Sequence, residues 1–455
     1  MNEELKEQLL ELLEQRKLKQ VKTMLEDLHM ADIAEIIEEF AEDHDCMIIF
    51  RLLPKDVGAE VFSYLSGETQ QVIVTKLNDS EIGYIVDDLY SDDAIDFIDE
   101  MPANLVEKIL KSANKQTRDT INKLLSYKEG SAGSVMTTEF VDLKKDMTST
   151  EAFARIRKLG EDVETIETLY VTDKKRELLG VLSIKELILA NPEETIENIM
   201  TTNPIYANTS TDQEELSLMF NKYDLYSLPI VDGEDRLVGI VTIDDIMEIT
   251  IEETTEDIEK MAGITPTDKP YLKTSIFKTW LNRIPWLLLL MLSATFTGLI
   301  ITNNEAVLNQ SEFGIILTAC IPMIMGTGGN AGGQASATVI RGITLNEISF
   351  KDSFRVLWKE ARISILCGAT LAVACFGKLL FIDGLFGKES GLLIAAIVSA
   401  AMLITIVLAK LVGCFLPLLA KKIHLDPAVM ASPFITTIVD VLSLLIFCNL
   451  AIALL

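Results

Sequence analysis

The pattern of hydrophobic and polar positions changes along this 455-residue chain. In residues 1–127, short runs such as LHMADIAEIIEEF (28–40) and LYSDDAIDFIDEM (89–101) carry apolar residues three and four apart, which is typical of short amphipathic helices. These runs recur at uneven intervals and predict an all-α helical superstructure of short repeats. Beyond residue 271 the pattern becomes five long apolar segments, which predict a five-helix α transmembrane domain.

Residues 131–250 contain an internal duplication. The motif SVMTT (134–138) returns as NIMTT (198–202), and LLGVLSIKEL (178–187) returns as LVGIVTIDDI (237–246). Each copy alternates short strands rich in β-branched residues with helical stretches. The middle of the chain is therefore predicted to be an α/β tandem pair.

The distribution of basic residues predicts how the apolar segments cross a bilayer. Lysine and arginine are concentrated in the loop 341–362 and follow the fourth segment, and they are absent from the loop 302–312. The positive-inside rule then places the N-terminus in the cytosol and the C-terminus outside. The predicted spans are roughly 284–302, 313–341, 362–382, 391–417 and 428–455.

Charge and cysteine content exclude several classes of protein. Of a formal net charge of −28, residues 1–270 contribute 59 acidic and 27 basic side chains, and residues 271–455 contribute 9 and 13. This balance makes nucleic acid an unsuitable partner, and the acidic half repels itself unless cations screen it. Five of the six cysteines lie in apolar segments and no CxxC pair exists, so neither a disulfide framework nor a zinc site is predicted. The start MNEELKEQ does not resemble a signal peptide, so we expect the acidic half to stay in the cytosol.

The last apolar segment carries one carboxylate, Asp440, about 18 Å along a helix counted from Pro427. We expect it near mid-membrane, as the only acid deep in an apolar span. An acid there costs at least about 2.5 kcal/mol unless it meets water, a cation or a partner. Thr436 and Thr437 share its helical face. A protonated aspartic acid bonded to a neighbouring helix is one interpretation, and a carboxylate that lines a cation path is the other.

The second apolar segment contains GTGGNAGGQ (326–334) after Pro322. So many glycines beside a proline predict that this span is not a stiff regular helix. Tight helix packing through small residues would explain the glycines. Asn330 and Gln334 nevertheless add polar groups at membrane depth, and with Asp440 they predict a polar lining.

Two acidic stripes stand out in the first half. Asp92 and Asp96 lie one turn apart in a segment crowded with acids, where like charges at this spacing are mildly destabilising. Residues 244–269 form an acidic helix with carboxylates at spacings of three and four. A solvated surface explains both stripes, and so does a cation-binding face.

The duplicated half resembles a tandem pair of CBS domains, on its paired motifs. In such pairs a hydroxyl and a carboxylate three residues apart can hold the phosphate and ribose of an adenine nucleotide such as ATP. Thr242 and Asp245 fit this pattern, whereas the first copy departs from it with Ser183 and Glu186. The alternative role of Thr242 is a helix N-cap.

The order of parts resembles the MgtE-type magnesium channels over essentially the whole chain. It runs from an acidic helical domain (1–130) through a CBS pair (131–248) and an acidic connecting helix (249–270) to a transmembrane domain (271–455) with GTGGNAGGQ and TTIVD (436–440). The resemblance implies a homodimer in the bacterial cytoplasmic membrane, with a pore between the subunits and hydrated Mg²⁺ held by Asp440 of both chains. It implies no enzymatic activity.

The same resemblance implies passive Mg²⁺ uptake that closes when cytosolic Mg²⁺ binds at acidic domain interfaces. The connecting helix corresponds to the family's plug helix. Gly333 departs from the family, which commonly has a second asparagine there. The implied metal residues are Asp440, Glu60, Asp92, Asp96, Asp212, Glu214, Asp224, Asp245, Glu248, Glu253, Glu256 and Asp257, and the implied pore-lining residues are Asn330, Gln334, Thr436, Thr437 and Asp426.

Other functions remain open from the residues. A broader divalent cation transporter for Co²⁺ or Mn²⁺ and an ion-coupled exchanger both fit the same polar lining. A membrane-anchored sensor that transports nothing fits less well, because an anchor needs neither Asp440 nor a glycine-rich span. An intramembrane aspartyl hydrolase is disfavoured, because Asp426 and Asp440 lie on one span and the chain has no GxGD or HExxH motif.

Overall fold

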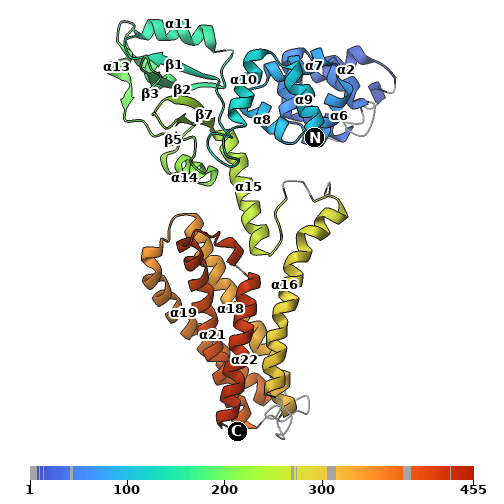
Figure 1. Cartoon of the computed structure of the whole chain (residues 1–455), viewed down its shortest axis with the longest axis vertical. Coiled ribbons are helices and arrows are strands. Elements are labelled where there is room, and N and C mark those ends of the chain that lie inside the picture. The colour runs from blue at the N-terminus through green and yellow to red at the C-terminus, as the bar shows by residue number, and fades with distance from the viewer. Residues whose placement is uncertain are drawn as a thin grey trace. The chain divides into compact units, whose positions relative to one another are not determined.

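The computed structural model describes residues 8–454 except 10, 14, 41–44, 161, 268–270, 273, 305–313, 383–390 and 431. It divides into two compact units, Met1–Thr250 and Ile251–Leu455. Each unit is described by itself (Figure 1).

The first unit begins with a bundle of short helices in which most helices contact the one two further along the chain. Prolines or asparagines precede several of them, and the Asn78 side chain forms a capping box with Glu81. Phe62 packs edge-to-face on Phe50 and Phe97, with ring centroids 6.1 and 4.9 Å apart. The predicted helical superstructure is confirmed. Its helices are α2 (Leu18–Leu25), α3 (Met30–Glu39), α4 (Asp45–Leu52), α5 (Lys55–Ser63), α6 (Gly67–Lys76), α7 (Asp79–Asp88), α8 (Ser91–Asp99), α9 (Ala103–Ser112) and α10 (Lys115–Leu124).

The rest of this unit repeats one arrangement of strands and helices twice. In each copy a parallel strand pair is followed by an antiparallel one, giving sheets of order β1-β2-β3-β4 and β5-β6-β7. The copies are joined by a buried hydrogen bond of 2.6 Å between the Tyr170 and Ser227 hydroxyls. The predicted α/β pair is confirmed. Its elements are β1 (Phe140–Lys144), α11 (Ser149–Leu159), β2 (Thr165–Thr172), β3 (Leu178–Ser183), α12 (Ile184–Leu189), α13 (Ile196–Ile199), β4 (Thr201–Thr202), β5 (Ala207–Asn208), α14 (Gln213–Tyr223), β6 (Ser227–Val231), β7 (Leu237–Thr242) and α15 (Ile243–Met261).

The second unit contains five helices that are long and apolar enough to cross a membrane, as predicted. Four of them form a bundle, and α16 runs along its side and contacts α22 (Figure 1). The apolar stretch of α16 is 0% buried within the chain. The elements are α16 (Ile276–Asn303), α18 (Gly314–Thr344), the 3-10 helix η1 (Phe350–Asp352), α19 (Ser353–Gly377), the π-helix η2 (Lys378–Ile382), α21 (Leu392–Lys422), the 3-10 helix η3 (Ala428–Met430) and α22 (Ser432–Leu454).

The glycine-rich segment corrects one prediction, because α18 is a continuous α-helix. Glycine costs about 1 kcal/mol per residue in a helix, but here it permits helix contacts that a side chain would block. A Cβ on Gly413 of α21 would lie 2.2 Å from the Gly332 carbonyl oxygen of α18. A Cβ on Gly328 would lie 2.7 Å from Cγ2 of Thr405. Close packing therefore supports the helix that local preference argues against.

A second correction concerns charge inside the bundle. Lys410 of α21 donates to Glu360 of α19 over 3.0 Å, and these side chains are only 7% and 14% exposed. Asp440 is therefore not the only acid within a spanning helix. Glu360 differs from Asp440 because its charge is neutralised by Lys410. Removing one member of such a buried pair typically costs about 3–5 kcal/mol of stability.

Candidate ion pathway and acidic interface

Asp440 is the acid of α22 and lies closer to one end of the helix than expected. The regular helix begins at Ser432 and not at Pro427, so Asp440 is eight residues, about 12 Å, from its first residue. Its side chain is half-buried and has no hydrogen-bond or ion-pair partner within the described part of the chain. A bond to a neighbouring helix, the alternative interpretation, is not found there. The carboxylate is available to a cation.

The predicted threonines anchor the same helix end. The hydroxyls of Thr436 and Thr437 donate to the Pro433 carbonyl over 2.9 and 3.1 Å. The Thr437 hydroxyl also lies 3.3 Å from that of Ser293 on α16. These bonds leave the hydroxyl oxygens able to accept, so both threonines place oxygens within one or two turns of Asp440.

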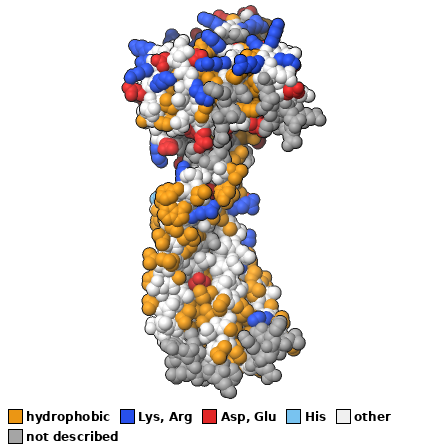
Figure 2. Space-filling view, turned by 90° about the vertical axis from the view of Figure 1, so that its right-hand side faces the viewer, with side chains coloured by type: hydrophobic (Ala, Val, Ile, Leu, Met, Phe, Trp, Pro, Cys, Tyr) orange, Lys and Arg blue, Asp and Glu red, His pale blue; other side chains and the backbone are white. Residues whose placement is uncertain are grey.

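Glycines of α18 bring the two predicted polar faces together. A Cβ on Gly329 would lie 3.2 Å from Cγ2 of Thr436, so the helices touch beside Asn330. Asn330 and Gln334 are four residues apart on one face and both are exposed. Figure 2 shows an acidic side chain on the second unit among hydrophobic and uncharged side chains. Exposed amides and a carboxylate are costly against lipid, which favours a water-filled path or a partner surface.

The end of α15 meets this end of the bundle. Gly263 follows α15 with φ +71, and a Cβ there would lie 2.9 Å from Pro433. Trp286 of α16 packs edge-to-face on Phe434, with centroids 5.6 Å apart. Because Pro433 is seven residues from Asp440, the chain after α15 packs about 10 Å along α22 from that carboxylate.

Charged groups also hold the end of α15. The Lys260 ammonium lies 2.8 Å from Asp426 and 2.6 Å from Glu256. The Thr344 hydroxyl of α18 donates to Asp257 over 3.4 Å. Burial and the nearby Asp426 carboxylate raise the pKa of Asp257. Asp426, predicted as pore-lining, is thus placed at the junction of α15 with the bundle.

In the first unit, the start of α8 docks on the α/β pair through Glu139. One oxygen of the Glu139 carboxylate accepts from the Ser91 hydroxyl at 2.7 Å and from the Ser91 amide at 3.2 Å. The Thr137 hydroxyl donates to the same oxygen over 2.8 Å. A carboxylate at a helix N-terminus is favourable, and this one fixes the adjacent Asp92 and Asp93.

Five carboxylates converge where α8 faces the start of α15, and none has an ion-pair partner within the described residues. Burial and the Asp245 charge raise the pKa of Asp92, and the same two causes raise that of Asp93 to about 7. Burial and Asp245 raise the pKa of Glu164 to about 8. Burial raises the pKa of Asp245 to about 6, although the hydrogen bonds from Thr242 act to lower it. We call Asp92, Asp93, Glu164, Asp245 and Glu248 the acidic interface.

The raised pKa values predict that the bare acidic interface weakens as pH rises. Groups with a raised pKa bind protons more tightly when docked, so docking is favoured at low pH and lost as pH passes through about 6 to 8. Without divalent ions, we expect hydrogen exchange at the α8 amides, divided by the intrinsic rate, to be about tenfold faster at pH 8 than at pH 6. Equal normalised rates at both pH values would contradict this.

The acidic interface is not a finished coordination site. No three His, Cys, Asp or Glu side chains of the described residues are arranged to hold a metal ion as they stand. Mg²⁺ keeps several of its waters and needs only one or two carboxylates directly, so it does not require a complete set of protein ligands.

The other predicted residues lie at the edge of the acidic interface or farther along the chain. Glu60 of α5 lies near Tyr64 and Tyr90, where burial and then nearby carboxylates raise the tyrosine pKa values. Asp96 is exposed one turn after Asp92. Asp212 and Glu214 begin α14 and Asp224 ends it, about 18 Å away, so one ion cannot bind both ends of the helix. Glu253, Glu256 and Asp257 lie on the second half of α15.

Sequence reasoning missed Glu164, Asp93 and Asp244 as members or neighbours of the acidic interface. Asp93 and Asp244 adjoin predicted acids, so their position beside these was a usable signal. Glu164 precedes β2 in a loop without any motif. Only the tertiary fold brings it to α8 and α15.

The predicted nucleotide residues form local bonds. The Thr242 hydroxyl donates to Asp245 over 2.6 Å at the start of α15. Ser183 and Glu186 form a complete capping box on α12, with 2.8 Å between hydroxyl and carboxylate. The first copy's pair is thus used as a cap, as its departure from the pattern suggested.

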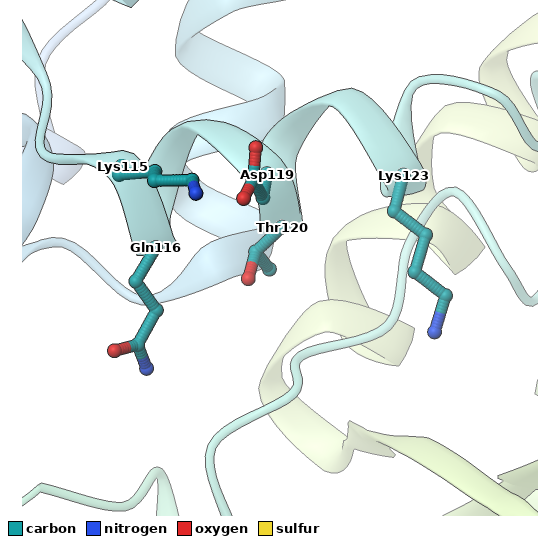
Figure 3. Close-up of a pocket in the computed structure, with 5 residues that line it drawn as sticks. All are labelled: Lys115, Gln116, Asp119, Thr120 and Lys123. Atoms are coloured by element: carbon teal, nitrogen blue, oxygen red, sulfur yellow. The ribbon is translucent and has the colours of Figure 1, made fainter.

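An open groove of about 510 Å³ follows α10 (Figure 3). One helix supplies its labelled residues, and none is a predicted site residue. They are Lys115, Gln116, Asp119, Thr120 and Lys123.

Five helices that are long and apolar enough to cross a membrane, in one chain with a duplicated α/β pair, indicate an integral membrane protein. Residues 321–450 match the MgtE divalent cation transporter family, residues 28–130 its intracellular N domain, and residues 132–193 and 196–252 the CBS domain. The chain belongs to the MgtE family of magnesium transporters, and the relatives that match along most of its length are named magnesium transporters.

Relatives and solved structures agree with this assignment. The magnesium transporter MgtE of Thermus thermophilus is 34% identical over 99% of this chain and 98% of its own length. The magnesium transporter MgtE of Bacillus subtilis is 32% identical over 97% of this chain and 95% of its own length. A crystal structure of the cytosolic domain of the Mg²⁺ channel MgtE with ATP is 35% identical, covers 53% of this chain and 98% of its own, and has a TM-score of 0.50. A crystal structure of the soluble part of a magnesium transporter is 26% identical, covers 55% of this chain and 98% of its own, and has a TM-score of 0.52.

Proposed function

We propose that this magnesium transporter is a channel for passive Mg²⁺ uptake across the bacterial cytoplasmic membrane, with its N-terminus in the cytosol and its C-terminus outside. The carrying observation is Asp440, a half-buried carboxylate without a partner among the described residues, beside exposed amides of α18. A hydrated Mg²⁺ at Asp440 would keep most of its waters and gain charge neutralisation. Asn330 and Gln334 would bind those waters.

The transporter acts as a homodimer in this proposal. One carboxylate is a poor partner for a divalent ion, and a two-fold axis next to α22 doubles it. The exposed polar face of α18 and the accessible Asp440 side chain support a pore between two copies, because each would otherwise face lipid.

Cytosolic Mg²⁺ closes the pore in this proposal. The acidic interface supports it, because its carboxylates repel one another when α8 is docked on α15. Divalent ions bind the docked arrangement better than the separated one and so shift the population toward docking. The end of α15, which packs beside Pro433, then acts as the plug. Glu60, Asp96, Asp212, Glu214, Asp224, Glu253 and Asp257 add to the attraction for ions.

An adenine nucleotide binds the second CBS copy in this proposal. The ATP complex of the relative's cytosolic domain supports it, together with Thr242 and Asp245 at the expected spacing. Asp245 also belongs to the acidic interface, so nucleotide and Mg²⁺ would act on the same helix start.

Flux into liposomes tests the proposed channel. Reconstituted protein is expected to admit Mg²⁺ when internal Mg²⁺ is near zero and to admit at least about tenfold less when it is in the millimolar range, where weak oxygen-ligand sites fill. A proton gradient should leave the rate unchanged, because nothing in the proposal couples transport to protons. Uptake that follows the proton gradient would favour the exchanger, and equal uptake of Co²⁺ or Mn²⁺ would favour the broader transporter.

A further inference from the structure

Lys260 is surrounded by two carboxylates that belong to different elements. Its ammonium lies 2.6 Å from Oε1 of Glu256, one turn earlier on α15, and 2.8 Å from Oδ2 of Asp426 in the link between α21 and α22. The three side chains are 23%, 39% and 33% exposed, so water reaches the group only in part. Distances below 3 Å mark charge-assisted hydrogen bonds.

The remaining groups at this junction make a cation necessary. Asp257 is next to Glu256 and repels Asp426. Asp426 is fixed in place because its other oxygen, Oδ1, accepts from the Ala428 amide over 2.8 Å. Without a positive charge, α15 and Asp426 would present like charges to each other. The Lys260 ammonium is the only cation paired with Asp426 in the described residues.

We propose that Lys260 is a tethered cation that fills the Glu256–Asp426 pair in place of a divalent ion. It keeps α15 attached to the α21–α22 link when Mg²⁺ is absent. The role rests on the proposed gating by α15. It also means that Mg²⁺ need not occupy this pair for the plug to stay in contact, so ion-dependent closure is left to the acidic interface.

Removing the ammonium while keeping both carboxylates separates this role from simple packing. In Lys260→Met, two acids face each other without a cation, so the end of α15 should detach in EDTA. Added Mg²⁺ should enter the vacated pair and restore the contact. In Asp426→Asn, the contact should also weaken in EDTA, but Mg²⁺ should restore it less because one carboxylate is missing.

Hydrogen exchange of full-length protein in nanodiscs measures this contact at residues 251–261. Lys260→Met is expected to exchange about five- to tenfold faster than wild type in EDTA, a coupling at the lower end of the usual range. It should return to the wild-type rate at 10–20 mM Mg²⁺, the concentration at which weak oxygen sites fill. The double variant Lys260→Asp/Asp426→Lys, in which the two charges are swapped, should restore protection in EDTA. Lys421→Met, which removes an exposed lysine near the end of α21, is the matched control.

Two outcomes overturn the inference. Wild-type exchange of Lys260→Met in EDTA means that the ammonium does not hold α15. Lys260 acts through packing alone if two results occur together. Mg²⁺ does not slow the fast hydrogen exchange of Lys260→Met, and the variant with swapped charges does not regain protection. The proposed gate fails by a separate result, which is wild-type flux that does not respond to internal Mg²⁺. That result does not depend on the hydrogen exchange of the variants.

Discussion

Replacing Asp440 by asparagine is expected to lower Mg²⁺ flux by at least about 30-fold. The substitution keeps the size of the side chain and removes its charge. Losing one partner of a close charged contact costs about 2–5 kcal/mol, and each 1.4 kcal/mol is tenfold in binding. Asp440 has no ion-pair partner within the described residues, so the variant should fold as well as wild type. Flux into liposomes, with thermal unfolding of the same sample, measures both effects.

Two comparisons make this test specific. Glu347→Gln removes an exposed acid between α18 and η1 and should leave flux unchanged. Dimers that contain one Asp440→Asn subunit should show flux well below half that of wild type, because one carboxylate cannot replace two in a shared pore. Wild-type Mg²⁺ flux in a correctly folded Asp440→Asn protein would refute both the ion path and its dimeric form.

The parts of the fold that the sequence predicts are those encoded locally. Apolar residues three and four apart define the short helices, and segments of about 20 apolar residues define the spans. The duplication predicts two similar α/β copies because both repeat the same motif. Asp440 was singled out as a candidate for the same reason, since a lone acid in an apolar segment is visible in any window.

The parts that could not be predicted depend on contacts between distant residues. Glu360 and Lys410 are 50 positions apart, and neither position shows that the other neutralises it. Lys260 and Asp426 are far apart in the sequence, and only the tertiary fold brings them together. The continuity of α18 was predicted wrongly because glycine preference is local, whereas the packing of Gly332 on Gly413 that offsets it is not.

Neutralising the acidic interface is expected to remove the response of the cytosolic domains to Mg²⁺. In Asp92→Asn, Asp93→Asn and Asp245→Asn combined, three amides replace carboxylates that repel one another on docking. A pair of like charges about 4 Å apart costs about 4 kcal/mol at an effective dielectric constant of 20, more than enough to decide a docking equilibrium. Asparagine resembles the protonated acid, and burial in the docked arrangement raises the pKa of Asp93 to about 7 and that of Asp245 to about 6, so docking favours the uncharged form more than separation does. The triple variant should therefore dock even in EDTA.

Tryptic cleavage after the exposed Lys128, between α10 and β1, measures this docking in the full-length protein. Wild type should be cleaved at least about tenfold more slowly in 10–20 mM Mg²⁺ than in EDTA, whereas the triple variant should be cleaved slowly in both. Its Mg²⁺ flux should then be low at every internal Mg²⁺ concentration. The control removes three exposed acids elsewhere in the same unit, by Glu26→Gln, Asp119→Asn and Glu215→Gln, and should respond like wild type.

The same measurement separates charge neutralisation from bridging by ions. If Mg²⁺ acts mainly by cancelling repulsion, asparagines replace it, and the triple variant stays docked. If Mg²⁺ must bridge α8 to α15, the variant lacks the ligands and is cleaved quickly in both buffers. The raised pKa values favour the first result. Burial and then the neighbouring carboxylates make these groups bind protons more tightly, although protons carry no bridging geometry. A variant that still responds to Mg²⁺ as wild type does would show that the sensor lies elsewhere.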